Sequence, residues 1–168
     1  MAEIAIEADF LKAMRRFAST VTILTAFDKG QPLGIVATAV CSLSLEPPSV
    51  LACINRSAFM HPVFARAPVF GVNILAVEQE GVVQRFLDPS LREMRFDGFD
   101  WHLHEEDVPV IDGSQASLVC KIGDRIEHSS HTIVIGEVID VLVRNEVSPL
   151  LYVDGALVQH NDRHASQI

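Results

Sequence analysis

Hydrophobic and polar positions change their period along the chain, from a helical spacing to one typical of strands. Asp9 is a plausible helix N-cap, and apolar residues then recur at helical spacing over 10–18. This helix is short and amphipathic, so we expect it to pack against something rather than to stand alone. Two β-branched, apolar runs follow at 21–27 and 33–40, and the turn residues at 28–31 between them predict a hairpin.

The rest of the chain predicts further strands and two short helices. Glu46–Pro48 interrupts the pattern, because proline cannot donate to a strand ladder. Strands are expected at 49–54, 69–75, 117–122, 131–143, 150–153 and 156–159, and helices at 58–66 and 78–86. The charged, turn-rich segment 87–98 predicts a mobile surface loop. Together these elements indicate a mainly β fold, a closed or nearly closed antiparallel barrel with a few short helices, in a single domain over 1–168.

Composition excludes several classes of protein. The chain has 168 residues, of which 49% are hydrophobic, and a formal net charge of −9, which disfavours nucleic acid and anionic membranes as partners. No apolar run is long enough to span a membrane and the N-terminus lacks a basic start, so we expect a cytoplasmic protein whose tail, 160–168, is frayed. Cys41, Cys53 and Cys120 form no C-x-x-C pair, and we interpret them as reduced, buried small hydrophobes.

Familiar catalytic and metal-binding motifs are missing. The sequence contains no G-x-G-x-x-G after a strand, no phosphate-binding P-loop and no G-x-S-x-G elbow. His102 and His104 would share one face of a strand, and His128 and His131 are three apart. Neither pair has a third ligand at a recognisable spacing, so we expect no metal site and place His102 and His104 on the surface.

Two stretches carry the candidate chemistry. In the first, small and hydroxylated residues cluster at the end of a strand, where the backbone could approach a planar ligand; they are Ala37, Thr38, Ala39, Val40, Cys41 and Ser42. The second begins at Cys53, where a strand ends and a helix is expected just after Ser57. Asn55, Arg56 and Ser57 add donors there that would suit a phosphate. A bulged strand and an ordinary helix cap are the alternative interpretations of these stretches.

In this order and spacing, the two stretches resemble the flavin reductase family with the FMN-binding split-barrel fold. The similarity is greatest to the small reductase components of two-component aromatic hydroxylases, of the hydroxyphenylacetate hydroxylase type. Further matching segments extend the resemblance over about 10–152; they include Phe70–Leu75, Arg95–Phe96, Trp101, His131–Val138 and Pro149–Tyr152.

The resemblance implies an NAD(P)H-dependent flavin reductase that transfers hydride from NADH or NADPH to FMN or FAD. It also implies a homodimer, and a partner monooxygenase that receives the reduced flavin. The implied flavin-binding residues are Ala37–Ser42, Cys53, Asn55, Arg56, Ser57, Phe59, Arg85 and Phe86. His131 is the candidate catalytic residue and Tyr152 lies with it on the nicotinamide side. Many family members have Gly-Asp-His where this chain has Ser129-Ser130-His131, which weakens the nicotinamide-side assignment.

Three alternatives remain open. The first is a flavin-binding protein of the same fold that does not oxidise reduced nicotinamide. The second is an oxidase acting on a phosphorylated pyridine. It would need further basic residues for a second phosphate, and the sequence offers no such cluster beyond Arg92 and Arg95. The third is a non-enzymatic β-barrel interaction module. The sequence does not decide between FMN and FAD, or between NADH and NADPH.

Overall fold

The computed structural model describes residues 2–159, and side chains from Ile6 onward. It confirms a mainly β protein with short helices. The strands are β1 (Ser19–Thr20), β2 (Thr22–Asp28), β3 (Gln31–Ala37), β4 (Val40–Leu45), β5 (Pro48–Asn55), β6 (Val69–Ile74), β7 (Trp101–Leu103), β8 (Pro109–Ile111), β9 (Ala116–His128), β10 (His131–Val143), β11 (Leu150–Val153) and β12 (Ala156–Gln159). The helices are α1 (Ala2–Met14), α2 (His61–Phe64) and α3 (Glu80–Leu87), with 3₁₀ turns η1 (Val77–Gln79) and η2 (Pro89–Met94).

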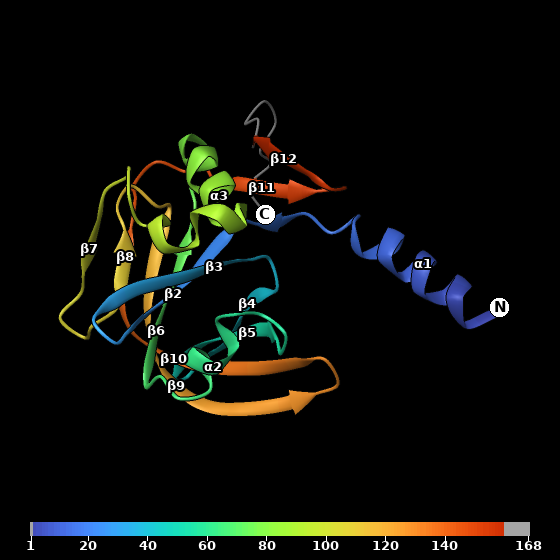
Figure 1. Ribbon diagram of the computed structural model, residues 1–168, viewed down its shortest axis with the longest axis horizontal. Coiled ribbons are helices and arrows are strands. Elements are labelled where there is room, and N and C mark those ends of the chain that lie inside the picture. The colour runs from blue at the N-terminus through green and yellow to red at the C-terminus, as the bar shows by residue number, and fades with distance from the viewer. Residues whose placement is uncertain (1, 160–168) are drawn as a thin grey trace.

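One seven-stranded antiparallel sheet forms the body, in the order β3-β2-β6-β9-β10-β5-β4 (Figure 1). Its two edge strands, β3 and β4, follow each other in the chain, with only Thr38 and Ala39 between them. The Cys53 amide donates to the Ala39 carbonyl at 2.9 Å, which attaches this link to β5. The sheet therefore curls into a split barrel whose open seam lies between β3 and β4.

Two apolar clusters hold the barrel together. The first fills the inner face of the sheet beneath α2 and includes Leu24, Ala52, Phe64 and Phe70. The second lies between β2, α3 and β11 and contains Phe86. Gly34 on β3 permits this second contact, because an added Cβ there would lie 2.5 Å from the Phe86 ring.

Helix α1 projects away from the body (Figure 1), and its apolar side chains, such as Phe10 at 64% exposure, face solvent. The prediction of Asp9 as the N-cap of this helix is therefore wrong. That the helix packs against something stays a prediction, with its apolar side chains free to contact a second molecule. The residues before Asp9 include the good helix formers Ala and Glu, so the helix begins at Ala2. Asp9 instead lies inside the helix and pairs with Lys12 at 3.4 Å.

The segment predicted as a mobile surface loop at 87–98 instead contains regular structure and buried side chains. It contains η2, and the Asp88 carboxylate accepts hydrogen bonds from the amide and hydroxyl of Ser90 at 2.8 and 2.7 Å. Arg95 and Phe96 are buried. An arginine in a charged run is ordinarily solvated, and only the tertiary contact with Phe59 and β3 makes this one a buried residue.

The first candidate stretch is divided rather than continuous. Strand β3 ends at Ala37, not Val40, and the unpredicted β4 pairs with β5 through a tight turn at Glu46–Pro47, where the peptide bond is cis. Leu43 is an extra residue on β4, since Ser42 pairs with Val50 while Ser44 pairs with Ser49. This is a β-bulge on an edge strand.

The smaller elements complete the fold. Strands β1, β11 and β12 form one small sheet, and the unpredicted β7 and β8 another. The predicted turn at Asp154–Gly155 is confirmed, with both residues at positive φ. No helix in residues 2–159 is long and apolar enough to cross a membrane. The predicted frayed tail, with His160 and His164, lies outside the described residues.

Candidate functional site

Two hollows meet at the end of β3, next to the seam of the barrel. Both are lined by Val36, Ala37 and Thr38. The larger, of about 520 Å³, lies between this strand end, α3 and the β11–β12 hairpin. The smaller, of about 210 Å³, lies between the strand end, the C-terminal end of β5 and the start of β10.

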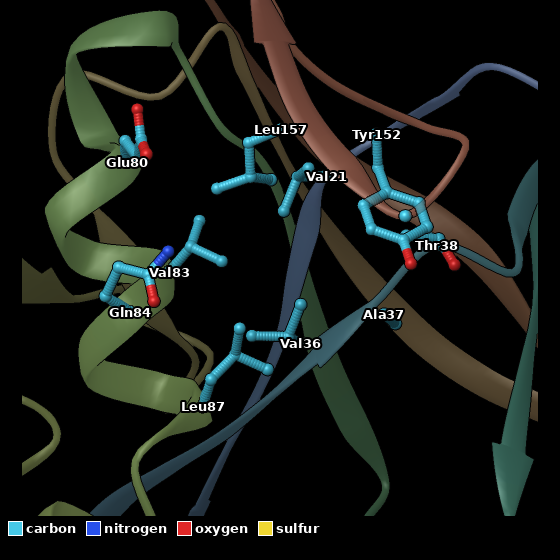
Figure 2. Close-up of a pocket in the computed structure, with 11 residues that line it drawn as sticks. Val21, Val36, Ala37, Thr38, Glu80, Val83, Gln84, Leu87, Tyr152 and Leu157 are labelled. Carbon is cyan, nitrogen blue, oxygen red and sulfur yellow. The ribbon is translucent and has the colours of Figure 1, made fainter.

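The larger hollow is mostly apolar, with polar groups at its margins (Figure 2). Val83, Gln84 and Leu87 line it from α3. Tyr152 and Thr38 lie on the opposite side, with their hydroxyl groups near each other in the view of Figure 2. Such a wall accommodates a flat apolar ring and leaves hydroxyl and amide groups for its polar edge.

The smaller hollow has small side chains and backbone along one wall. Ala37, Thr38 and Ala39 form that wall, facing Asn55 and His131. The strand register places His131 directly opposite Asn55. The His131 imidazole Nδ1 lies 2.9 Å from the Ser130 hydroxyl, which orients the ring at the mouth of the hollow.

A compact turn follows β5 at Asn55–Ala58. The Asn55 side-chain oxygen accepts from the amide and the hydroxyl of Ser57 at 2.9 and 2.8 Å. The Arg56 guanidinium is half-exposed and lies 3.5 Å from a Glu127 carboxylate oxygen. The Arg56 guanidinium also donates to the Ser129 carbonyl at 3.4 Å, so an anion at this turn would compete with Glu127 for Arg56.

The expected helix N-terminus at this turn is absent. Helix α2 begins at His61, because Ser57–Met60 closes as turns through the bonds Ala58 N–H to Asn55 O and His61 N–H to Ala58 O. The turn therefore offers side chains and turn amides as donors, and no helix dipole.

Several predicted site residues do not line either hollow. Cys41 and Ser42 are exposed on β4, where Val40 packs against the core. Phe86 is 2% exposed and packs within the second apolar cluster. Arg85 donates from Nε to the Met94 carbonyl at 3.0 Å, bracing η2.

A different face of α3 lines the larger hollow. Glu80, Val83, Gln84 and Leu87 form this face, and the sequence analysis missed all four. Their spacing of three, four and seven residues marks one side of a helix, and this pattern could have identified them.

The histidines and cysteines form no metal site in the described part of the chain. His102 lies 2.6 Å from the Asp112 carboxylate and His104 lies 3.0 Å from that of Asp140, so each histidine has a carboxylate partner. The Val141 amide and then His104 lower the pKa of Asp140. Cys120 is buried, and burial raises its pKa to about 12. Cys41 is exposed, contrary to expectation.

Comparison with known proteins finds relatives that are all named as flavin reductases or flavin oxidoreductases. Residues 14–160 match the model of the flavin reductase like domain. The chain is 35% identical to the reductase component of an FADH2-dependent resorcinol hydroxylase from Rhizobium sp., over 86% of this chain and 82% of that protein. It is 33% identical to an NADH-dependent FMN reductase from Agrobacterium fabrum, over 88% and 82%. Its structure is similar to an NADH:FAD oxidoreductase from Streptomyces globisporus, solved with NAD and FAD fragments, with a TM-score of 0.87, 32% identity and 95% coverage of each chain.

Proposed function

Because the chain belongs to the flavin reductase like domain family, we propose that it is a flavin reductase that oxidises NADH or NADPH and reduces FMN or FAD. The observation that carries this proposal is the pair of hollows meeting at Val36–Thr38. One hollow is lined mostly by apolar side chains, and the other is bordered by Asn55 and Ala58 of the turn that follows β5. The relatives named above, an FADH2-supplying component and an NADH-dependent FMN reductase, support the same activity.

The donor set fits a flavin mononucleotide unit. The small side chains of Ala37 and Ala39 allow the ring system to approach the backbone, since larger residues would fill the smaller hollow. Asn55, Arg56 and Ser57 would hold the phosphate, and Cys53 lies just before that turn. A bound flavin supplies the hydride-accepting chemistry, so the protein needs no acid–base pair.

The chain's own task is to place two rings face to face. Thr38 belongs to both hollows, and would position the flavin between them. We assign His131 and Tyr152 to the nicotinamide side, with His131 orienting the carboxamide. The two residues line different hollows, so each would contact a different part of the ligands. We expect the protein to contribute to hydride transfer mainly by excluding water from between the stacked rings and by holding them in near-attack geometry.

The remaining predicted site residues take supporting roles in this proposal. Val40, Cys41 and Ser42 would border the flavin along β4, at the open seam. Phe59 would cover the phosphate end. Arg85 and Phe86 would act indirectly, by fixing α3 and η2 beside the larger hollow.

We also propose a homodimer that passes reduced flavin to a partner monooxygenase in the cytoplasm. Exposed apolar side chains on the outer face of β9 and along α1, including Ile126 at 49% and Phe10 at 64%, support an interface between two copies. The name of the Rhizobium relative supports the oxygenase partner.

Oxidation of NADH and NADPH, followed by absorbance with and without added FMN, FAD or riboflavin, tests the proposal. We expect the rate of nicotinamide oxidation to rise with added flavin. The rates would also show which nicotinamide and which flavin the protein prefers. A protein that binds flavin but oxidises neither nicotinamide would instead be the non-catalytic flavin binder. A protein that binds no flavin at all would contradict both.

A further inference from the structure

Two guanidinium groups lie over the aromatic ring of Phe59, which follows the turn at Asn55–Ala58. Phe59 comes directly after Ala58, which lines the smaller hollow. The Arg92 Cζ lies 4.9 Å from the centre of the Phe59 ring and the Arg95 Cζ lies 4.6 Å from it. Arg92 on η2 and Arg95 just after it thus bring two positive charges close to Phe59, although they are more than thirty positions away in the sequence.

Neither arginine is neutralised by a carboxylate. Among residues 2–159, no carboxylate oxygen lies within 4.0 Å of Arg92 or Arg95, although acidic residues outnumber basic ones by 22 to 13. Glu93 and Asp97 border the adjacent hollow of about 260 Å³ without pairing with either. Arg56, Arg66 and Arg144, by contrast, each have a carboxylate partner.

Arg95 is held in place by contacts that leave its charge uncompensated. It is 7% exposed, and its Nη1 donates to the Gly34 carbonyl at 3.2 Å. Its Nε is buried and has no hydrogen-bond partner. Burial and the charge of Arg92 lower the pKa of Arg95. A guanidinium buried without a counter-ion is costly, and a nearby bound anion would remove much of that cost.

Arg92 is placed to contact such an anion directly. Its side chain is exposed while its guanidinium remains over Phe59, so its donors are accessible from solvent. The planar, forked guanidinium matches the geometry of phosphate oxygens. Arg95 would then supply a fixed positive charge beside Arg92, over the same Phe59 ring.

We propose that Arg92, Arg95 and Phe59 form a second anion site, which binds the outer phosphate of a dinucleotide whose inner phosphate lies at Asn55–Ser57. This inference rests on the proposed function and extends it to substrate choice. FAD and the nicotinamide dinucleotides both carry this diphosphate, whereas FMN carries one phosphate and riboflavin none.

The test compares ligands that differ in their phosphates, by calorimetric titration of the wild type and Arg92→Gln. If FAD supplies the diphosphate, its affinity falls about tenfold in the variant, as expected for loss of one charged hydrogen bond, while FMN and riboflavin change less than about twofold. Lys29→Gln is the matched control. It removes the same charge from an exposed residue at the β2–β3 turn and should leave every affinity unchanged.

A second titration, of the FMN-loaded protein with NAD⁺, separates the two sources. If the nicotinamide dinucleotide supplies the diphosphate, this affinity falls about tenfold and the preference between FAD and FMN stays constant. Equal weakening of FAD and FMN, or no change in either titration, would overturn the second site. Because binding is measured without turnover, a protein that failed to oxidise NADH would refute the proposed function and leave this comparison intact.

Discussion

At the scale of single residues, His131 offers the most direct test of the nicotinamide side. His131→Ala should raise the KM for NADH severalfold, because the proposal assigns the imidazole to the nicotinamide carboxamide. The affinity for FMN should stay within about twofold, since the proposed phosphate contacts lie on β5 and its turn. Steady-state kinetics and flavin titration measure the two effects separately.

His128→Ala is the matched control for that variant. His128 is opposite His131 in the β9–β10 register, but it lines neither hollow. The kinetic constants of the His128→Ala variant should equal those of the wild type. Unchanged kinetics in His131→Ala would remove this residue from the proposed site.

The cysteines should differ sharply in reactivity. Cys41 is exposed, whereas burial raises the pKa of Cys120 to about 12. In mildly alkaline buffer, iodoacetamide should alkylate Cys41 in the folded protein and reach Cys120 only after unfolding, because the thiolate is the reactive form. Mass spectrometry of the digested protein identifies the order; early labelling of Cys120 would contradict its burial.

The same pKa shift has a defined effect on stability. The folded protein holds the Cys120 proton more tightly than the unfolded chain, whose thiol titrates near 9.0. The raised pKa of Cys120 therefore contributes fully to the free energy of unfolding below pH 9.0. That free energy should decrease as the pH rises from 9.0 towards 12.

At the scale of elements, the contact between β3 and α3 depends on a glycine. Gly34→Ala places a methyl group against Phe86 and Ile23, at 2.5 and 3.2 Å, and should cost about 1–3 kcal/mol. That cost lowers the melting temperature by several degrees in a domain of this size. Thermal unfolding followed by circular dichroism measures it.

Gly81→Ala is the opposite case and the natural comparison. Gly81 lies in the first turn of α3 with no atom within 4 Å of the added Cβ, so the change should stabilise the helix by up to about 1 kcal/mol. Equal melting temperatures in the two variants would show that β3 and α3 can separate without cost.

Periodicity predicted one of the two 13-residue strands in full: β9 was predicted only over 117–122, although it extends to His128. It also missed the elements that depend on tertiary contacts. The run at 131–143 is β-branched and continuous, so β10 was predicted with both ends correct. Strand β4 was missed because a bulge and two prolines obscure its alternation. Strands β7 and β8 are three residues each, too short for a periodic signal.

The candidate site was only partly predictable for a related reason. Asn55, Ala37 and His131 occur at strand ends, where turn chemistry leaves a trace in the sequence, and they do lie around one hollow. The pairing of Phe59 with Arg92 and Arg95 joins distant segments, and no local pattern shows it. Arg85 and Phe86 were selected by resemblance, whereas helical phase places Glu80, Val83, Gln84 and Leu87 at the larger hollow.

At the scale of the whole molecule, an apolar outer face crosses three strands. Ile133 on β10 is flanked by Cys53 on β5 and by Ile126 on β9, all in direct register. If this face forms the proposed homodimer, Ile126→Lys should weaken association by about 100-fold, because burial of an unpaired charge is costly. Analytical ultracentrifugation over a range of concentrations measures this.

Leu103→Lys provides the control for the dimer. Leu103 is exposed to a similar degree, at 41%, but belongs to the separate β7–β8 sheet. A monomeric wild type, or equal effects of the two variants, would exclude the outer face of β9 and β10 as the interface.

The bulge at Leu43 has a consequence for the behaviour of the protein at high concentration. Strand β4 is an edge with unpaired backbone groups and carries two exposed leucines, Leu43 and Leu45. A flat strand of this kind recruits strands from other molecules, and the extra residue prevents this by twisting the edge. Deleting Leu43 would restore regular pairing along β4, and the variant should form thioflavin-positive aggregates on storage while the wild type does not. A Leu45 deletion, beyond the bulge, should not.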